Sequence, residues 1–153
     1  MTDDARFSDA DEGPLRLRAL DADDLGVISG LAQDAVFPAA EMKWDRRRRR
    51  FALLLNRFRW EWPSREAERV RSVLSIEEVT GVASQGVDPR EKATVLSLLS
   101  VGFEPGDDGT GRVVLTLSGD GAIGVEVEAL EVLLRDVTRP YVAPSRKRPA
   151  HPD

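Results

Sequence analysis

Two residue types that carry much of enzyme chemistry are almost missing from this sequence. The 153-residue chain has no cysteine, which excludes disulfide bonds, thiolate nucleophiles and cysteine metal ligands. Its one histidine, His151, falls in a proline-rich stretch near the end, so no His/Cys metal site and no triad with a histidine base can form. An enzyme would need carboxylates, lysines or Tyr141 for proton transfer. We therefore expect neither a metal site nor catalytic residues of the common kinds.

Long apolar runs are also missing. No segment approaches the roughly 18 apolar residues of a membrane helix, and the acidic first residues lack the apolar centre of a signal peptide. We expect a cytoplasmic protein. The glycines Gly119, Gly121 and Gly124 fit the dinucleotide-binding fingerprint, but residues 122–127 alternate like a strand where that motif needs a helix. A hairpin turn accounts for these glycines, and we expect no cofactor.

What is present has the composition of one globular domain, with 41% hydrophobic and 32% charged residues. Residues 1–14 are acidic and end in Gly13-Pro14, which predicts a disordered leader. Residues 139–153 hold four prolines around three consecutive basic residues, which predicts a disordered tail. The folded domain is predicted over 15–138.

Apolar periodicity within this domain predicts mostly strands. Residues 15–20 alternate with period two, and Asp21 then suits the N-cap of a helix over 22–33. Further strands are predicted over 36–44, 50–62, 70–85 (long or broken), 94–104, 113–117 and 123–127. Residues 129–137 fit a short C-terminal helix or a strand equally well. The predicted fold class is α+β and predominantly antiparallel: a roll or half-open barrel of six to eight strands with one N-terminal helix, for which a pleckstrin-homology roll is an analogue.

The segment 50–62 predicts the core most directly. Its even positions are nearly all apolar, while its odd positions change from apolar to charged at Arg57. The pattern predicts a core face on the even positions and an odd face that is buried only in its first half. Five residues are therefore predicted to be mostly buried: Phe51, Leu53, Leu54, Phe58 and Trp60.

Several segments together resemble one bacterial family. They are Leu15–Ser29, Gln33–Val36, Arg50–Glu61, Leu96–Leu99, Phe103–Pro105, Gly121–Ile123, Val125–Glu128 and Leu134–Asp136. The family is catalogued as "domain of unknown function 2948" and is chiefly alphaproteobacterial. The resemblance covers about 15–138, and the run Arg50–Phe58 is its most specific part. The loop at Ser64–Glu68 departs from it by being charged and irregular. The resemblance implies kinship and brings no activity, ligand or catalytic residue.

The feature most suggestive of function is the arginine hairpin, residues 46–50, which lies between two predicted strands. Residues 41–71 carry eleven basic and five acidic residues in a chain of net charge −5. Arginine pairs well with phosphate or carboxylate, and neighbouring tryptophans could stack on bases. A solvated turn is the competing interpretation. The candidate binding residues are Arg46, Arg47, Arg48, Arg49, Arg57 and Arg59.

Three functions follow from these observations. The favoured one is a non-catalytic binding or scaffold module that docks a protein partner. The alternatives are a binder of a phosphate-bearing ligand or RNA through the arginine hairpin, and a carboxylate-dependent enzyme. Overall acidity disfavours a general nucleic-acid binder. The sequence leaves the identity of the partner and the oligomeric state open.

Overall fold

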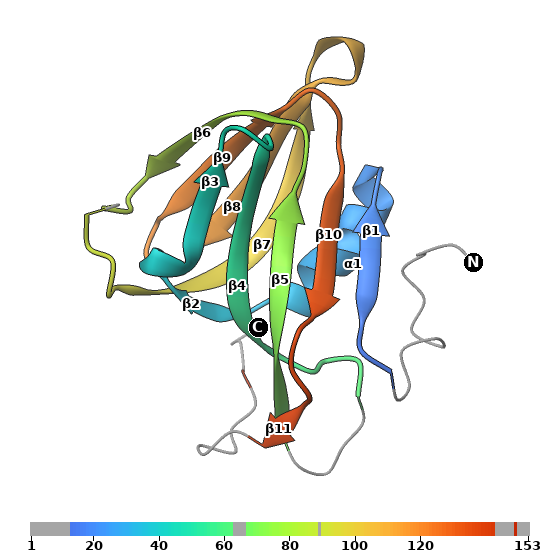
Figure 1. Ribbon diagram of the computed structural model, residues 1–153, viewed down its shortest axis with the longest axis vertical. Helices are drawn as coiled ribbons and strands as arrows, with labels where there is room; N and C mark the ends of the chain where they lie inside the picture. Colours follow the sequence, from blue (N-terminus) through green and yellow to red (C-terminus); the bar gives the residue numbers. More distant parts are fainter. Residues whose placement is uncertain (1–12, 63–66, 89, 143–148, 150–153) are drawn as a thin grey trace.

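Alternating apolar residues produce a fold dominated by one antiparallel sheet (Figure 1). The computed structural model describes residues 13–62, 67–88, 90–142 and 149. Within these residues there is one α-helix, and the predicted fold class is confirmed. The elements are β1 (Arg16–Ala19), α1 (Ala22–Ala32), β2 (Val36–Pro38), the 3-10 helix η2 (Ala39–Glu41), β3 (Met42–Asp45), β4 (Arg50–Phe58), β5 (Glu68–Ile76), β6 (Val79–Gln85), β7 (Val95–Pro105), the 3-10 helix η3 (Asp107–Gly109), β8 (Gly111–Leu117), β9 (Ala122–Val127), β10 (Val132–Asp136) and β11 (Tyr141–Val142).

The order of the strands makes the sheet curl without closing. Neighbouring strands run β1-β10-β5-β4-β2-β7-β8-β9-β6, while β3 pairs with β4 and β11 pairs with β5. The two ends of this path, β1 and β6, do not pair with each other in the described part of the chain. In the described part of the chain the sheet is therefore a half-open barrel whose main path ends in two edge strands, β1 and β6. Its eleven described strands exceed the predicted six to eight because the segments 36–44 and 70–85 each form two strands and because β11 also joins the sheet.

The single α-helix is fixed at its start and on one face. The Asp21 carboxylate accepts a hydrogen bond from the backbone N–H of Asp24 at 2.8 Å, so the predicted N-cap is confirmed. Leu25 and Ile28 are fully buried, and the helix packs mainly against β7 and β1. No helix in the described ranges is long and apolar enough to cross a membrane.

The core face of β4 is the odd one, so the predicted core is wrong in part. Phe51, Leu53 and Phe58 are buried as expected, but Leu54 is half-buried on the outer face and Trp60 is 37% exposed. The odd face continues inward to Arg57, whose side chain is completely buried. Alternation did not predict this face because Arg57 interrupts it, and the charge of Arg57 is compensated by Glu61, four residues away, and by Asp136, which is distant in sequence.

Two ambiguous segments are now assigned. The long or broken strand over 70–85 is two strands, β5 and β6, separated at Glu78, whose positive φ of 57° belongs to a turn. Residues 132–136 form β10 rather than a helix. The short strand β11 brings Tyr141 and Val142 into the sheet, beyond the predicted boundary at 138. Residues 1–12, 143–148 and 150–153 of the predicted leader and tail lie outside the described residues.

Candidate binding surface

The arginine hairpin connects the neighbouring strands β3 and β4 (Figure 1). Asp45 pairs with Arg50 in the antiparallel ladder, and residues 46–49 form the turn between them. The Asp45 carboxylate accepts a hydrogen bond from the backbone N–H of Arg48 at 3.1 Å. Arg49 has a φ of 55°, which reverses the chain back into β4. The turn thus has a defined backbone that presents its side chains outward.

Carboxylates of the fold neutralise only part of this hairpin. Arg49 pairs with Glu128 at 2.7 Å, and Arg50 pairs with Glu77 at 2.9 Å. Arg48 lies 3.9 Å from Asp45, at the limit of an ion pair.

The first two arginines of the hairpin differ from the others. Arg46 and Arg47 are exposed, and no carboxylate among the described residues lies within ion-pairing distance of either. The hairpin therefore has an internally paired base and a tip with uncompensated positive charge.

A cavity of about 550 Å³ lies beside the hairpin. The hairpin side contributes Trp44, Arg46 and Arg49, and the opposite side is formed by residues 79–82 of β6 together with Glu128. A backbone hydrogen bond from Val79 N–H to the Arg49 carbonyl, 2.9 Å long, joins the two sides at one end. The cavity thus lies between the arginine hairpin and the first half of β6.

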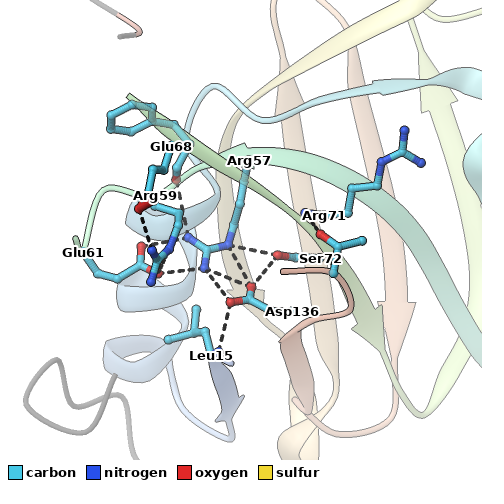
Figure 2. A network of polar contacts seen from close by, with 10 residues as sticks. Leu15, Arg57, Arg59, Glu61, Glu68, Arg71, Ser72 and Asp136 are labelled. Atoms are coloured by element: carbon cyan, nitrogen blue, oxygen red, sulfur yellow. Dashed lines mark hydrogen bonds and ion pairs between the residues drawn. The ribbon is translucent and has the colours of Figure 1, made fainter. Parts of the chain in front are cut away.

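Arg57 and Arg59, the other two candidate binding residues, lie elsewhere, in a buried polar network (Figure 2). The Arg57 guanidinium donates to both oxygens of Glu61, at 2.9 and 2.8 Å, and to Asp136 at 3.0 Å. Its Nε donates to the Ser72 hydroxyl at 3.0 Å, and that hydroxyl donates to Asp136 at 2.7 Å. All the nitrogens of Arg57 are therefore occupied by partners inside the protein.

Charge compensation sets the pKa values in this network. Burial alone raises the pKa of Glu61, but the hydrogen bonds and charge of Arg57 outweigh burial and hold that pKa below its ordinary value. Burial likewise lowers the pKa of Arg57, and Glu61 and Asp136 reverse the effect, so the pKa of Arg57 is raised overall. Both partners stay ionised inside the protein.

The same network ties the ends of the domain together. Asp136, at the end of β10, also accepts a hydrogen bond from the backbone N–H of Leu15 at 2.9 Å, just before β1 begins. Arg59 pairs with Glu68 at 2.8 Å, and its guanidinium lies 4.8 Å from the centre of the Trp62 ring. These contacts hold neighbouring strands in place. Arg57 and Arg59 are therefore not part of the hairpin surface.

Sequence reasoning missed a second basic surface on the outer face of the sheet. Arg16 of β1 stands directly opposite Arg135 of β10, both are exposed, and Arg71 of β5 follows diagonally. Figure 2 shows the Arg71 guanidinium pointing away from the buried network. No carboxylate in the described ranges pairs with any of these three side chains. The signal available in the sequence was the alternation around Arg16, but its neighbours across the sheet, Arg71 and Arg135, are distant in sequence.

No group of three or more His, Cys, Asp or Glu side chains in the described part of the chain is arranged to hold a metal ion. The acidic residues near the hairpin are instead engaged with arginines, as Glu77 and Glu128 show.

Comparison with known proteins defines kinship and gives no activity. No curated protein and no solved structure matches the chain. The family described as "Protein of unknown function (DUF2948)" matches residues 15–151, which include every described strand and the helix. The chain therefore belongs to that family.

Proposed function

We propose that this domain is a non-catalytic binding module that docks an acidic protein partner through the arginine hairpin. The observation that supports this most is the unpaired charge of Arg46 and Arg47 at an exposed tip. Carboxylates on a partner would form the ion pairs that Arg46 and Arg47 do not make within the described fold. Charge complementarity of this kind raises association rates and selects partners, with an effect that weakens as salt increases.

The base of the hairpin supports the same function. The ion pairs of Arg49 with Glu128 and of Arg50 with Glu77 restrain the hairpin on both sides. A restrained loop loses less conformational entropy on binding than a mobile one. The tip is therefore prepared for contact before a partner arrives.

The buried carboxylates support a non-catalytic role. A general acid or base needs a pKa near the working pH and access to a substrate. The Glu61 and Asp136 carboxylates accept hydrogen bonds from Arg57 and are 2% and 4% exposed. The pKa of Glu61 is moved away from neutrality, so this pair is suited to holding strands together rather than to transferring protons.

The experiment compares two double variants that each remove two positive charges. Arg46→Ser with Arg47→Ser removes the unpaired tip, and Arg90→Ser with Lys92→Ser is the charge-matched control on the exposed segment before β7, where Arg90 pairs with Asp88 at 3.1 Å. The measurement is fluorescence anisotropy with labelled poly-glutamate at several salt concentrations, followed by affinity capture from the native cell extract. We expect the tip variant to lose binding at unchanged melting temperature and the control to retain it. Equal binding by wild-type protein and the tip variant would refute the proposal.

A phosphate-bearing ligand is a second candidate, favoured by a different observation. The opposed side chains Arg16 and Arg135 border a cavity of about 470 Å³ on the outer face of the sheet. Like charges directly across a strand pair repel each other, and a bound dianion would relieve that repulsion. Titration with inorganic phosphate and with a short RNA should then shift the backbone resonances of β1 and β10. The variant Arg135→Ser should abolish the shift, and retention of the shift would refute this site.

A further inference from the structure

The last strand of the sheet path, β6, is an edge strand without the usual protection. Natural edge strands are commonly protected by charged side chains or proline, because their free backbone groups can pair with another chain. The sequence of β6, VTGVASQ, contains no charge and no proline. On one side β6 pairs with β9, and on the other side no described strand pairs with it.

The register of β6 identifies which backbone groups are free. Leu117 N–H donates to the Gly121 carbonyl at the turn between β8 and β9, which sets the alternation of hydrogen-bonded pairs along β9. When this alternation is followed from β9 to its partners on β6, Gly81, Ala83 and Gln85 are the residues that bond to β9. Val82 and Ser84, which lie between them, therefore direct their backbone groups outward.

A second hydrogen bond gives the same alternation independently. Val79 directs its N–H outward to the Arg49 carbonyl, and the bulge between Val79 and Gly81 then shifts the alternation by one residue. Val82 and Ser84 consequently point their N–H and C=O groups away from β9. No backbone hydrogen bond from another described residue reaches these groups.

This free edge borders the cavity beneath the arginine hairpin. Val82 on β6 and Trp44 on β3 are both half-buried and pack at the margin of the core. Arg46 lines the same cavity. An extended chain placed along β6 would therefore meet apolar surface on one side and positive charge at the end nearest the hairpin.

We propose that an acidic, extended segment of the partner adds to the outer edge of β6 as an extra strand. The proposal rests on the proposed function and specifies the partner: a segment that alternates apolar and acidic residues. Its backbone pairs with Val82 and Ser84, which gives affinity without regard to sequence. Its apolar side chains cover Val82 and Trp44, and its carboxylates pair with Arg46 and Arg47, which gives selectivity.

The experiment removes one outward backbone donor. Ser84→Pro deletes the Ser84 N–H without touching a bond to β9, and proline is tolerated on edge strands. Ser84→Ala is the matched control because it changes the side chain and keeps the donor. The probe is a fluorescein-labelled decapeptide of alternating valine and glutamate, used with the full chain. We expect Ser84→Pro to weaken binding at least tenfold at unchanged circular dichroism, and Ser84→Ala to bind within twofold of wild type.

Amide hydrogen exchange on the wild-type protein gives a second measurement, which does not depend on how the proline variant folds. Bound peptide should slow exchange at Val82 and Ser84, and unchanged exchange there at saturating peptide would overturn strand addition. Sedimentation provides a further check. A wild-type dimer that Ser84→Pro converts to monomer would show that a second copy of the chain occupies the edge, which also overturns the proposal.

The two proposals fail in different ways. If removal of Arg46 and Arg47 abolishes binding while Ser84→Pro binds normally, the hairpin docks the partner and strand addition is wrong. If Ser84→Pro abolishes binding while the arginine variant binds normally, the edge takes a strand and both the acidic partner and the docking role of the hairpin are wrong.

Discussion

Replacing Arg57 by methionine would test whether the buried network is held by charge compensation. The substitution keeps an unbranched apolar side chain of similar length and removes the guanidinium that contacts Glu61 and Asp136 at 2.8 and 3.0 Å. Two carboxylates that are 2% and 4% exposed would then lose this cation, which leaves Arg59 at 4.0 Å from Glu61 as the nearest remaining charge of the network. Breaking a buried ion pair from one side typically costs about 3–5 kcal/mol. That is a large part of the roughly 5–15 kcal/mol of a typical domain.

The same change should reverse the pH dependence of this site. In the wild-type protein the pKa of Glu61 is lowered, so its contribution to stability is complete above the unfolded value of about 4.3 and is lost as pH falls toward the folded value. In Arg57→Met, burial opposed only by the more distant Arg59 raises the folded pKa of Glu61 above its unfolded value. Glu61 then binds a proton on folding, and the variant recovers about 1.4 kcal/mol per pH unit between the two pKa values as pH falls. The deficit of the variant should therefore shrink on acidification.

Urea denaturation followed by circular dichroism at neutral pH and near pH 4.5 measures both effects. The matched control is Arg71→Met, because Arg71 is exposed and has no carboxylate partner among the described residues. Its cost should stay within about 0.5 kcal/mol at both pH values. A deficit for Arg57→Met below about 1 kcal/mol at neutral pH, or one that is equal at both pH values, would refute the reasoning.

Two further predictions concern packing. Leu53→Ala should lower the free energy of unfolding by about 2–5 kcal/mol because Leu53 is 2% exposed, whereas Leu54→Ala on the half-buried face should cost only about 1 kcal/mol. Equal costs of the two variants in urea denaturation would contradict the assigned core face of β4. Gly111→Ala should cost about 1–3 kcal/mol because a Cβ there would lie 2.5 Å from a ring carbon of Phe103 and from the backbone oxygen of Glu104. Gly102→Ala, with no neighbouring atom within 4 Å, should be neutral or slightly stabilising, and equal melting temperatures of the two variants would contradict this geometry.

Local sequence patterns predicted the elements that local interactions stabilise. The helix was predictable because its N-cap bond joins Asp21 to Asp24, only three residues apart. The hairpin between β8 and β9 was predictable because turn residues lie between two alternating segments. The sequence left open whether 70–85 is one long strand or a broken one, because Glu77 and Glu78 carry no glycine or proline signal and the turn depends on a non-glycine residue with positive φ.

The face of β4 was assigned wrongly for a nonlocal reason. Arg57 interrupts the apolar odd positions, so alternation alone favours the even face. Its burial depends on Glu61, four residues away, and on Asp136, which is brought alongside by the pairing of β10 with β5. Register across strands distant in sequence decides this contact, and a single sequence does not encode it in a form that periodicity can detect.

Some arginines of this protein are ion-paired and others are not, depending on where carboxylates lie in the fold. This difference supports a docking role. The chain has 27 acidic residues against 22 lysines and arginines, so carboxylates are not scarce. Arg57 pairs with two of them in the interior, and at the base of the hairpin Arg49 pairs with Glu128 and Glu78 while Arg50 pairs with Glu77. Arg46 and Arg47 project beyond the reach of the described carboxylates because the turn extends past the end of the ladder. Their charge is therefore left uncompensated by the described fold and accessible to a partner, beside the edge strand β6, which carries no charged residue of its own.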